Sequence, residues 1–215
     1  MYRLIATDID GTLLTSSKTV TPRTIAALRA AADAGVHVVP ISGRQAHVLR
    51  PVVELAGVDG YAVCANGAVC YHLGRDEVVF ENLLSVPAQT ELVTRLREVR
   101  PEVRCVSVRD AGRTFVPEVG YVGMMDPGDH GAPHEIGEFP LAEVLAAPSV
   151  KLVVRQTGVA PEELLADVVD LDAAGCQPTI SGAPFVEVAD AGVTKASGLE
   201  RLCGIHGVQQ HAVIA

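Results

Sequence analysis

Short apolar runs alternate with amphipathic stretches over the first 70 residues of the chain. Three of the apolar runs are typical of buried β-strands, and they cover residues 4–7, 36–41 and 61–65. Helical patterns follow the first two runs. A strand–helix–strand order with short connections favours a parallel sheet, because parallel neighbours need a crossover between them. The pattern therefore predicts an α/β fold for this part of the chain.

The first predicted helix carries start and stop signals. Thr21 is placed to cap its amino end, and Pro22 takes the first helical position, where a missing N–H does no harm. Ile25 and Leu28 mark the apolar face of this helix. Gly35 is expected to end it, because glycine readily adopts the left-handed conformation that closes many helices.

Asn66 and Gly67 follow the third predicted strand. This dipeptide is typical of a hairpin turn, and here it leads into Val69 and Tyr71. Ligands of open parallel sheets bind beyond the carboxyl ends of the strands, so Asn66 is placed to contact a substrate. Asn66 could equally serve the turn alone.

The pattern changes between residues 81 and 184. Helical periodicity at residues 87–99 and 161–171 is mixed with strand candidates at residues 104–108, 149–155 and 185–188. We therefore expect an inserted α+β domain of residues 81–184 within a core formed by residues 1–80 and 185–215.

Composition narrows the classes of protein to consider. The formal net charge of −9 argues against a nucleic-acid surface, which normally needs a basic stripe. The chain has no apolar window as long as a membrane span and no secretion signal, so we expect a cytoplasmic protein with no membrane partner. Its five cysteines are odd in number and lack paired zinc spacing, which favours reduced thiols.

Asp8 and Asp10 stand at the end of the first predicted strand. Residues two apart in an extended chain project to the same side, so the two carboxylates can converge on one hard cation. Mg²⁺ often binds through one or two carboxylates and a substrate phosphate. The alternative is a solvated turn, because Asp and the following Gly11 are good turn formers.

Two further segments have the composition of phosphate-binding sites. Ser42 and Gly43 lie between the second strand and a helical pattern, where free N–H groups and the helix dipole favour an anion. An ordinary helix cap is the alternative interpretation. Lys195 falls in the first turn of a helix that Thr194 is placed to cap. A cation there opposes the helix dipole, and neutralising a phosphoryl group would explain it, although a solvated surface lysine remains possible.

In this order the segments resemble the motifs of the haloacid dehalogenase-like phosphatase superfamily, and most closely its Cof-like subgroup. The similarity is carried by residues 8–14 (Asp8-Ile9-Asp10-Gly11-Thr12-Leu13-Leu14), 41–44, 64–68, 181–188 and 192–195. The resemblance spans nearly the whole chain, and its first motif is the most specific part. It implies a Rossmann-like parallel-sheet core with an inserted α+β cap domain.

The resemblance also implies a role for each matching residue. Asp8 would form an aspartyl-phosphate, and Asp10 would serve as general acid and then general base. Ser42, Gly43 and Lys195 would hold the phosphoryl oxygens, and Asp8 and Asp10 would bind Mg²⁺. The implied activity is hydrolysis of small phosphomonoesters, such as sugar phosphates or related metabolites.

The chain departs from the family pattern at its carboxyl end. The acidic fourth motif is expected after a strand at residues 211–215, where the sequence ends. We therefore expect weaker Mg²⁺ binding, impaired activity, and possible self-association through an exposed sheet edge. Two alternatives to a phosphatase are a phosphomutase and a catalytically inactive protein that binds a phosphate ligand or a partner.

The inserted region offers little further chemistry. A transition-metal site could be imagined among polar residues between Met124 and Glu135, but irregular spacing and many Pro and Gly residues favour a loop. The residues in question are Asp126, Asp129, His130, His134 and Glu135. Lys151 and Arg155 could face a substrate, although charged strand residues more often form a solvated face.

Overall fold

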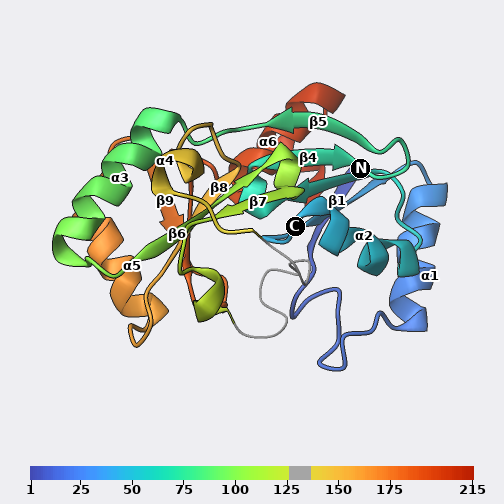
Figure 1. Ribbon diagram of the computed structural model, residues 1–215. Helices are drawn as coiled ribbons and strands as arrows, with labels where there is room; N and C mark the ends of the chain where they lie inside the picture. Colours follow the sequence, from blue (N-terminus) through green and yellow to red (C-terminus); the bar gives the residue numbers. More distant parts are fainter. Residues whose placement is uncertain (126–136) are drawn as a thin grey trace. The chain divides into compact units, whose positions relative to one another are not determined.

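The computed structural model describes residues 1–125 and 137–215 (Figure 1). The chain divides into two compact units, one of residues 1–81 and 193–215 and the other of residues 82–192. The residues considered above for a transition-metal site, from Asp126 to Glu135, lie outside the described part. Among the described residues, no helix has the length and apolar character needed to cross a bilayer.

The first unit contains a six-stranded sheet in the order β11-β1-β2-β3-β4-β5. Its strands are β1 (Leu4–Asp8), β2 (His37–Ile41), β3 (Tyr61–Cys64), β4 (Val69–His72), β5 (Glu77–Glu81) and β11 (Val213–Ile214). The neighbours from β11 to β3 are parallel, as expected, whereas β4 and β5 extend the sheet antiparallel. Asp8 is in register with Ile41, so the chain leaves β1 and β2 at the same edge.

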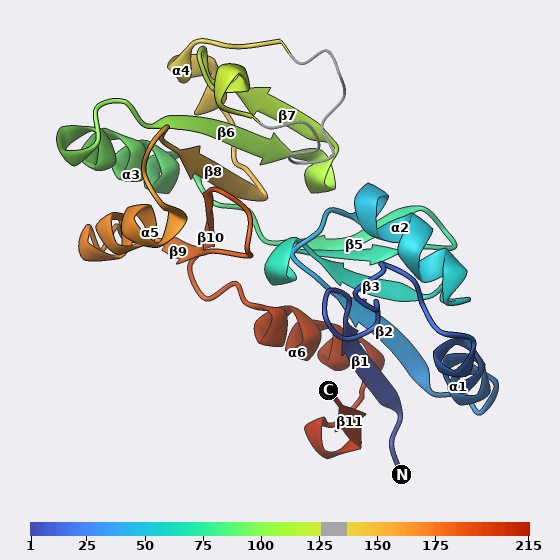
Figure 2. The same cartoon turned by 90° about the horizontal axis from the view of Figure 1, so that it is seen from below.

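Three helices cover this sheet: α1 (Pro22–Asp33), α2 (Ala46–Leu55) and α6 (Lys195–His206). Figure 2 shows α6 on one face and α1 and α2 on the opposite face. Leu202 and Cys203 of α6 are buried in one apolar cluster with Leu4, Val39 and Val63 of the central strands. This packing fixes α6 against the strands that carry Asp8 and Ser42.

The helix ends agree with the sequence signals. Thr21 caps α1 by accepting a hydrogen bond from the Thr24 N–H, and Pro22 is the first helical residue. Gly35 follows the last turn with a φ of 78°. Asn66 and Gly67 belong to the short 3₁₀ turn η1 (Ala65–Gly67), which joins the antiparallel strands β3 and β4 as the hairpin prediction requires.

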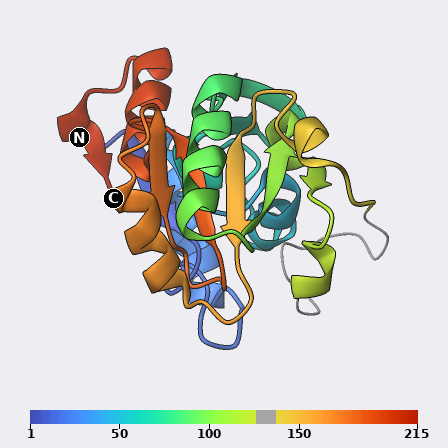
Figure 3. The ribbon, with the colours of Figure 1, turned by 60° about the vertical axis from the view of Figure 1, so that its left-hand side comes forward.

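The second unit contains a five-stranded antiparallel sheet in the order β7-β6-β8-β10-β9. Its strands are β6 (Arg104–Arg109), β7 (Thr114–Pro117), β8 (Lys151–Arg155), β9 (Cys176–Thr179) and β10 (Val186–Asp190). Its helices are α3 (Val86–Val99), α4 (Leu141–Val144) and α5 (Pro161–Asp170). Figure 3 shows α3 and α5 side by side, and both pack into one apolar cluster with the sheet. Other short 3₁₀ turns are η2 (Asp110–Gly112), η3 (Val122–Met124) and, in the first unit, η5 (Gln210–Ala212).

The boundary after the inserted unit differs from the expected one. The strand near residues 185–188 was predicted to belong to the core, but β10 pairs with β8 and β9 of the second unit. The second unit therefore extends to Gly192 rather than to residue 184, whereas its first boundary differs by one residue.

Lys151 is not part of a solvated face. It is 4% exposed, and its ammonium group forms an ion pair with Glu187, which is also 4% exposed. Ser181 donates a second hydrogen bond to the same carboxylate at 3.1 Å. This pair was not predicted, because its two residues lie 36 positions apart in the sequence.

Candidate active site

Four segments of the first unit end or begin beside one another at the carboxyl ends of the parallel strands. Asp8 is the last residue of β1, Ser42 follows β2, and Asn66 lies in η1 after β3. Lys195 is the first residue of α6. The carboxyl ends of parallel strands are the usual place for a ligand site in such a sheet.

Asp8 and Lys195 form an ion pair across 187 sequence positions. The Nζ of Lys195 lies 3.0 Å from Oδ2 of Asp8, and both side chains are 42% exposed. The other carboxylate oxygen of Asp8 accepts a hydrogen bond from the Ile9 N–H at 2.7 Å. The carboxylate is therefore held in place while it remains accessible to a ligand, and Lys195 is not an isolated surface cation.

The start of α6 is fixed by a reciprocal pair of hydrogen bonds. Thr194 accepts from the backbone N–H of Ser197, and the Ser197 hydroxyl accepts from the backbone N–H of Thr194. This confirms the predicted cap and orients Lys195. A Cβ on Gly67 would lie 2.0 Å from the Thr194 carbonyl oxygen, so η1 and the start of α6 are in close contact.

Asp10 is held by two cations that the sequence analysis did not identify. Arg44 donates from Nε to Oδ2 at 2.9 Å and from Nη2 to Oδ1 at 2.7 Å, and Lys18 donates to Oδ1 at 3.1 Å. The hydrogen bonds from Arg44 are the largest cause that lowers the pKa of Asp10 to about 2; partial burial opposes this effect, and Lys18 adds to it. The same pairing raises the pKa of Arg44. Asp10 is thus a stable carboxylate here.

Ser42 and Gly43 form a tight turn next to Asn66. Ser42 is 2% exposed, and its hydroxyl accepts a hydrogen bond from the Arg44 N–H at 3.2 Å. It does not cap α2, whose N-cap is Gln45, so the helix-cap interpretation is wrong. The Asn66 N–H donates to the Ser42 carbonyl at 3.0 Å, and a Cβ on Gly43 would lie 2.7 Å from Oδ1 of Asn66.

The side chains at this site offer carboxylate oxygens, the type of ligand that a hard cation prefers. Asp8 and Asp10 offer two carboxylates, which is the number that Mg²⁺ commonly takes when water and phosphate complete its shell. No group of three or more His, Cys, Asp and Glu side chains suited to a metal occurs in residues 1–125 and 137–215. A bound Mg²⁺ would therefore depend on oxygen ligands beyond these two side chains.

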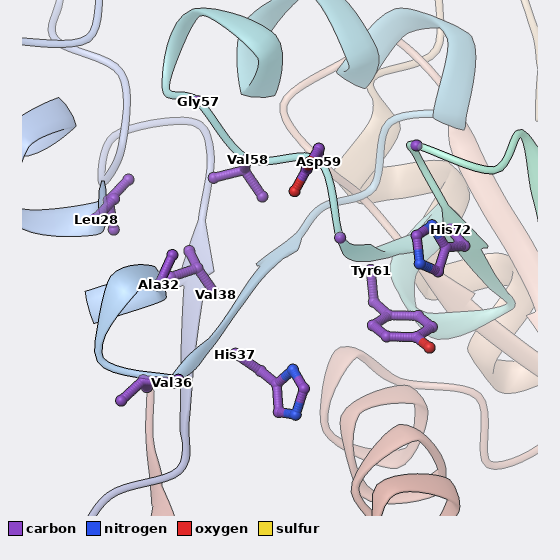
Figure 4. Close-up of a pocket in the computed structure, with 13 residues that line it drawn as sticks. Leu28, Ala32, Val36, His37, Val38, Gly57, Val58, Asp59, Tyr61 and His72 are labelled. Carbon is purple, nitrogen blue, oxygen red and sulfur yellow. The ribbon is translucent and has the colours of Figure 1, made fainter. Parts of the chain in front are cut away.

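A separate cavity of about 430 Å³ lies at the other end of the parallel strands. It is lined by Leu28 and Ala32 of α1 and by His37, Tyr61 and His72 at the ends of their strands (Figure 4). His37 and Tyr61 begin β2 and β3, whereas the candidate active site lies where those strands end. This cavity is distinct from the candidate active site.

The chain is similar in sequence to proteins named as phosphatases. The chain is 25% identical over 208 residues to a phosphoglycolate phosphatase of Methanoculleus marisnigri. This alignment covers 86% of each protein. Over 96 residues it is 34% identical to a pyridoxal phosphate phosphatase of Escherichia coli K12, which covers 45% of this chain. That alignment spans 35% of the length of the E. coli protein.

Solved structures show the same fold. A phosphatase of the haloalkanoate (HAD) enzyme superfamily from Bacteroides thetaiotaomicron superposes with a TM-score of 0.78 at 21% identity, covering 99% of this chain and 76% of that one. A sugar phosphatase of HAD subclass IIB gives a TM-score of 0.76 at 19% identity, covering 98% and 78%. The family model for haloacid dehalogenase-like hydrolases matches residues 5–215. The chain belongs to the haloacid dehalogenase-like hydrolase family.

Proposed function

We propose that the protein is a Mg²⁺-dependent phosphatase that hydrolyses small phosphomonoesters through an aspartyl-phosphate on Asp8. The observation that carries this proposal is the accessible Asp8 carboxylate paired with Lys195 at the carboxyl end of β1. A nucleophile and a cation at one point are what phosphoryl transfer needs, because its catalysis is mostly positioning and charge stabilisation. The relatives named as phosphatases support the same activity.

The first step transfers the phosphoryl group to the protein. An oxygen of Asp8 forms a bond to phosphorus while the bond from phosphorus to the ester oxygen breaks. Asp10, in its protonated form, gives its proton to that leaving oxygen. Lys195 is close enough to Asp8 to stabilise the charge on the transferring oxygens.

The second step returns the protein to its starting state. Asp10, now a carboxylate, accepts a proton from water as the water oxygen attacks phosphorus. The bond between phosphorus and Asp8 breaks, which releases inorganic phosphate and the free carboxylate. Ser42 and Gly43 would hold the phosphoryl oxygens through the turn that joins β2 to α2, and Asn66 beside them would contact the substrate.

Asp8 and Asp10 are the residues that would hold Mg²⁺. When bound, the ion supplies positive charge that offsets the repulsion between an anionic carboxylate and an anionic phosphate. The substrate class we favour is sugar phosphates and related phosphorylated metabolites. The names of the relatives support this class, which includes pyridoxal phosphate and phosphoglycolate as well as sugar phosphates.

A second candidate function is binding of a phosphorylated ligand without turnover. One observation favours it: both carboxylate oxygens of Asp10 accept hydrogen bonds from cations, and this pairing disfavours the protonated form that the first step needs. The two functions differ in whether phosphate is released.

The test is phosphate release from a panel of phosphorylated metabolites by the full chain, with Mg²⁺ and with a chelator. We expect Mg²⁺-dependent release that Asp8→Asn abolishes, with the protein still folded by circular dichroism. Thermal stabilisation by a panel member without any release would favour the binding protein instead. Release that persists in Asp8→Asn would contradict the proposed mechanism.

A further inference from the structure

The cavity at the amino ends of the parallel strands lies where the sheet opens. β1 and β2 are in register at five positions, whereas the register of β2 with β3 is the single pair of Ile41 and Val63, at their carboxyl ends. His37, Val38 and Tyr61, near the other ends of β2 and β3, line the cavity. Its volume of about 430 Å³ lies within the range of small-molecule sites, roughly 300–1,000 Å³. The opening is therefore large enough for a small organic ligand.

The walls of this cavity suit a flat ring. One wall is aliphatic and includes Leu28, Ala32 and Val58 (Figure 4). The other carries the rings of Tyr61 and His72, whose centroids lie 4.6 Å apart with 68° between the ring planes. A planar aromatic ligand can stack on such rings while its edge contacts the aliphatic side chains. An aromatic ring is therefore the apolar group that this cavity fits best.

Polar side chains of the lining set the hydrogen bonds that a ligand can form. Nδ1 of His72 accepts a hydrogen bond from the Arg75 N–H at 3.3 Å, so in the neutral imidazole Nε2 carries the proton and can donate it. The Asp59 carboxylate and the Tyr61 hydroxyl form no hydrogen bond with any residue that the structure describes. The cavity can thus donate to a ring nitrogen and accept from an amine.

The charge of the lining favours a neutral or weakly basic ligand. Asp59 is the one acidic side chain among the described lining residues, and lysine and arginine are absent from them. Arg29 lies beside Gly57, because its Nε is 2.9 Å from the position of a Cβ on that glycine, but Arg29 does not line the cavity. A phosphate or carboxylate group would meet the negative charge of Asp59 without a lining cation to offset it.

The loop that carries Asp59 is anchored through its backbone. The Asp59 carbonyl accepts a hydrogen bond from the Gly74 N–H at 2.8 Å, and the Gly60 carbonyl accepts one from the Leu73 N–H at 2.8 Å. These bonds tie the start of β3 to the end of β4. Asp59 itself is exposed, so its carboxylate stands at the rim of the cavity on a fixed support.

We propose that this cavity is a second ligand site, which takes a planar nitrogen heterocycle with an exocyclic amine, of the nucleobase class. The ring would stack on Tyr61 and His72, and the amine would donate a hydrogen bond to Asp59. Nε2 of His72 would donate to a nitrogen of the ring. The inference goes beyond the proposed function, because the site lies at the opposite end of the strands from Asp8 and involves no phosphoryl group.

The first test is titration of the full chain with adenine and with purine, which has the same rings but no exocyclic amine. Proton NMR of the imidazole C2–H groups follows binding. We expect the signals of His37 and His72 to shift, and those of His47 in α2 and His211 in η5 to stay in place. Adenine should bind roughly 10-fold more tightly than purine, because it alone can donate an amine hydrogen bond to Asp59.

The second test uses variants of the lining. Asp59→Ala should weaken the binding of adenine roughly 10-fold and leave that of purine nearly unchanged. Glu54→Ala, which removes an exposed carboxylate outside the lining, is the matched control. Ala32→Leu should narrow the cavity and weaken both ligands roughly 10-fold, whereas Ala30→Leu, exposed on the same helix outside the lining, should weaken neither.

Each contrary result overturns a stated part of the inference. Equal binding of adenine and purine, or an Asp59→Ala variant that binds adenine as tightly as the wild type, overturns the ligand class. Shifts at His47 without shifts at His37 and His72 overturn the location. No shift with either compound up to its solubility limit overturns the whole proposal. None of these results bears on phosphate release, which tests the proposed function separately.

Discussion

At the scale of single residues, Lys195 stands in an electrostatically unfavourable position, and its contact with Asp8 offers a reason for a cation there. A positive charge in the first turn of α6 opposes the helix dipole. Its 3.0 Å contact with the carboxylate places it where a phosphoryl group would bind under the proposed mechanism. Both partners of this ion pair are 42% exposed, and exposed ion pairs add little to stability, so the effect of Lys195 should lie mainly in catalysis.

We therefore expect Lys195→Met to lower kcat by roughly 100-fold or more, the effect of removing one donor to a developing charge. Its thermal unfolding temperature should stay close to that of the wild type. The measurement is steady-state phosphate release, with Arg23→Met in the exposed first turn of α1 as a charge-matched control. Equal loss of kcat in both variants would contradict a specific role for Lys195.

The sequence predicted some residues of the candidate site but not others, and the reason is physical. Asp8, Ser42 and Lys195 stand at strand ends or in a helix turn, and these positions are marked by local apolar patterns and caps. Arg44 pairs with Asp10 across 34 positions, and Lys18 does so from a turn. No local pattern records such side-chain contacts.

At the scale of elements, the contact of α6 with η1 needs two glycines. A Cβ on Gly198 would lie 2.8 Å from both the Gly67 Cα and the Val63 Cγ1. Gly204 is in the same helix, and a Cβ there would meet no atom within 4 Å. Substitutions at Gly198 and Gly204 therefore distinguish the effect of close packing from the effect of helix propensity.

We expect Gly198→Ala to lower the free energy of unfolding by about 1–3 kcal/mol, the usual effect of overpacking. Gly204→Ala should raise it by about 0.5–1 kcal/mol, because alanine favours the helix. Urea unfolding of both variants measures the difference. If both substitutions stabilise the protein, the close contact between α6 and η1 is not present in solution.

A second feature at this scale is a cluster of aromatic rings at the end of the sheet opposite the candidate active site. The ring of His206 lies 5.1 Å from that of His37 and 4.4 Å from that of Tyr61, and Tyr61 also contacts His72. The buried Nε2 of His206 has no hydrogen-bond partner among the described residues. Burial first, and then His37 and His72, lower the pKa of His206 below its ordinary value of 6.5.

Stability should therefore fall on the acid side of neutrality. Below pH 6.5 the unfolded chain takes up a proton at His206 more readily than the folded chain, so the free energy of unfolding falls as the pH drops toward the folded pKa. His206→Gln should lose less stability between pH 7 and pH 5 in urea titrations. The exposed His211→Gln is the control. An unchanged slope in His206→Gln would contradict the burial effect.

Elements with strong periodicity were predicted well, and the weak strands were missed. The sequence patterns located α3, α5, β6 and β8. The strands β7 and β9 were not predicted; each is four residues long, contains proline and lies at an edge of its sheet. Proline is tolerated at edges because an edge strand leaves some N–H groups unpaired.

At the scale of the whole molecule, two separate units build the chain. The unit of residues 82–192 is continuous, whereas the other joins residues 1–81 to 193–215. The sequence predicted this insertion from the change in pattern at residue 81. It could not predict where the insertion ends, because β10 resembles any buried strand and its partners are set by long-range pairing.

The whole chain is also the right object for the decisive experiment. The central claim is that Asp8 becomes covalently phosphorylated during turnover. The protein is mixed with Mg²⁺ and a metabolite that it hydrolyses, and the reaction is quenched rapidly with acid. The measurement is then mass spectrometry of the protein, followed by peptide mapping. We predict the added mass of one phosphoryl group on Asp8 in the wild type and no addition in Asp8→Asn. Phosphate release with no phosphoryl group on Asp8, under conditions that trap the intermediate in an established family member, would contradict the account.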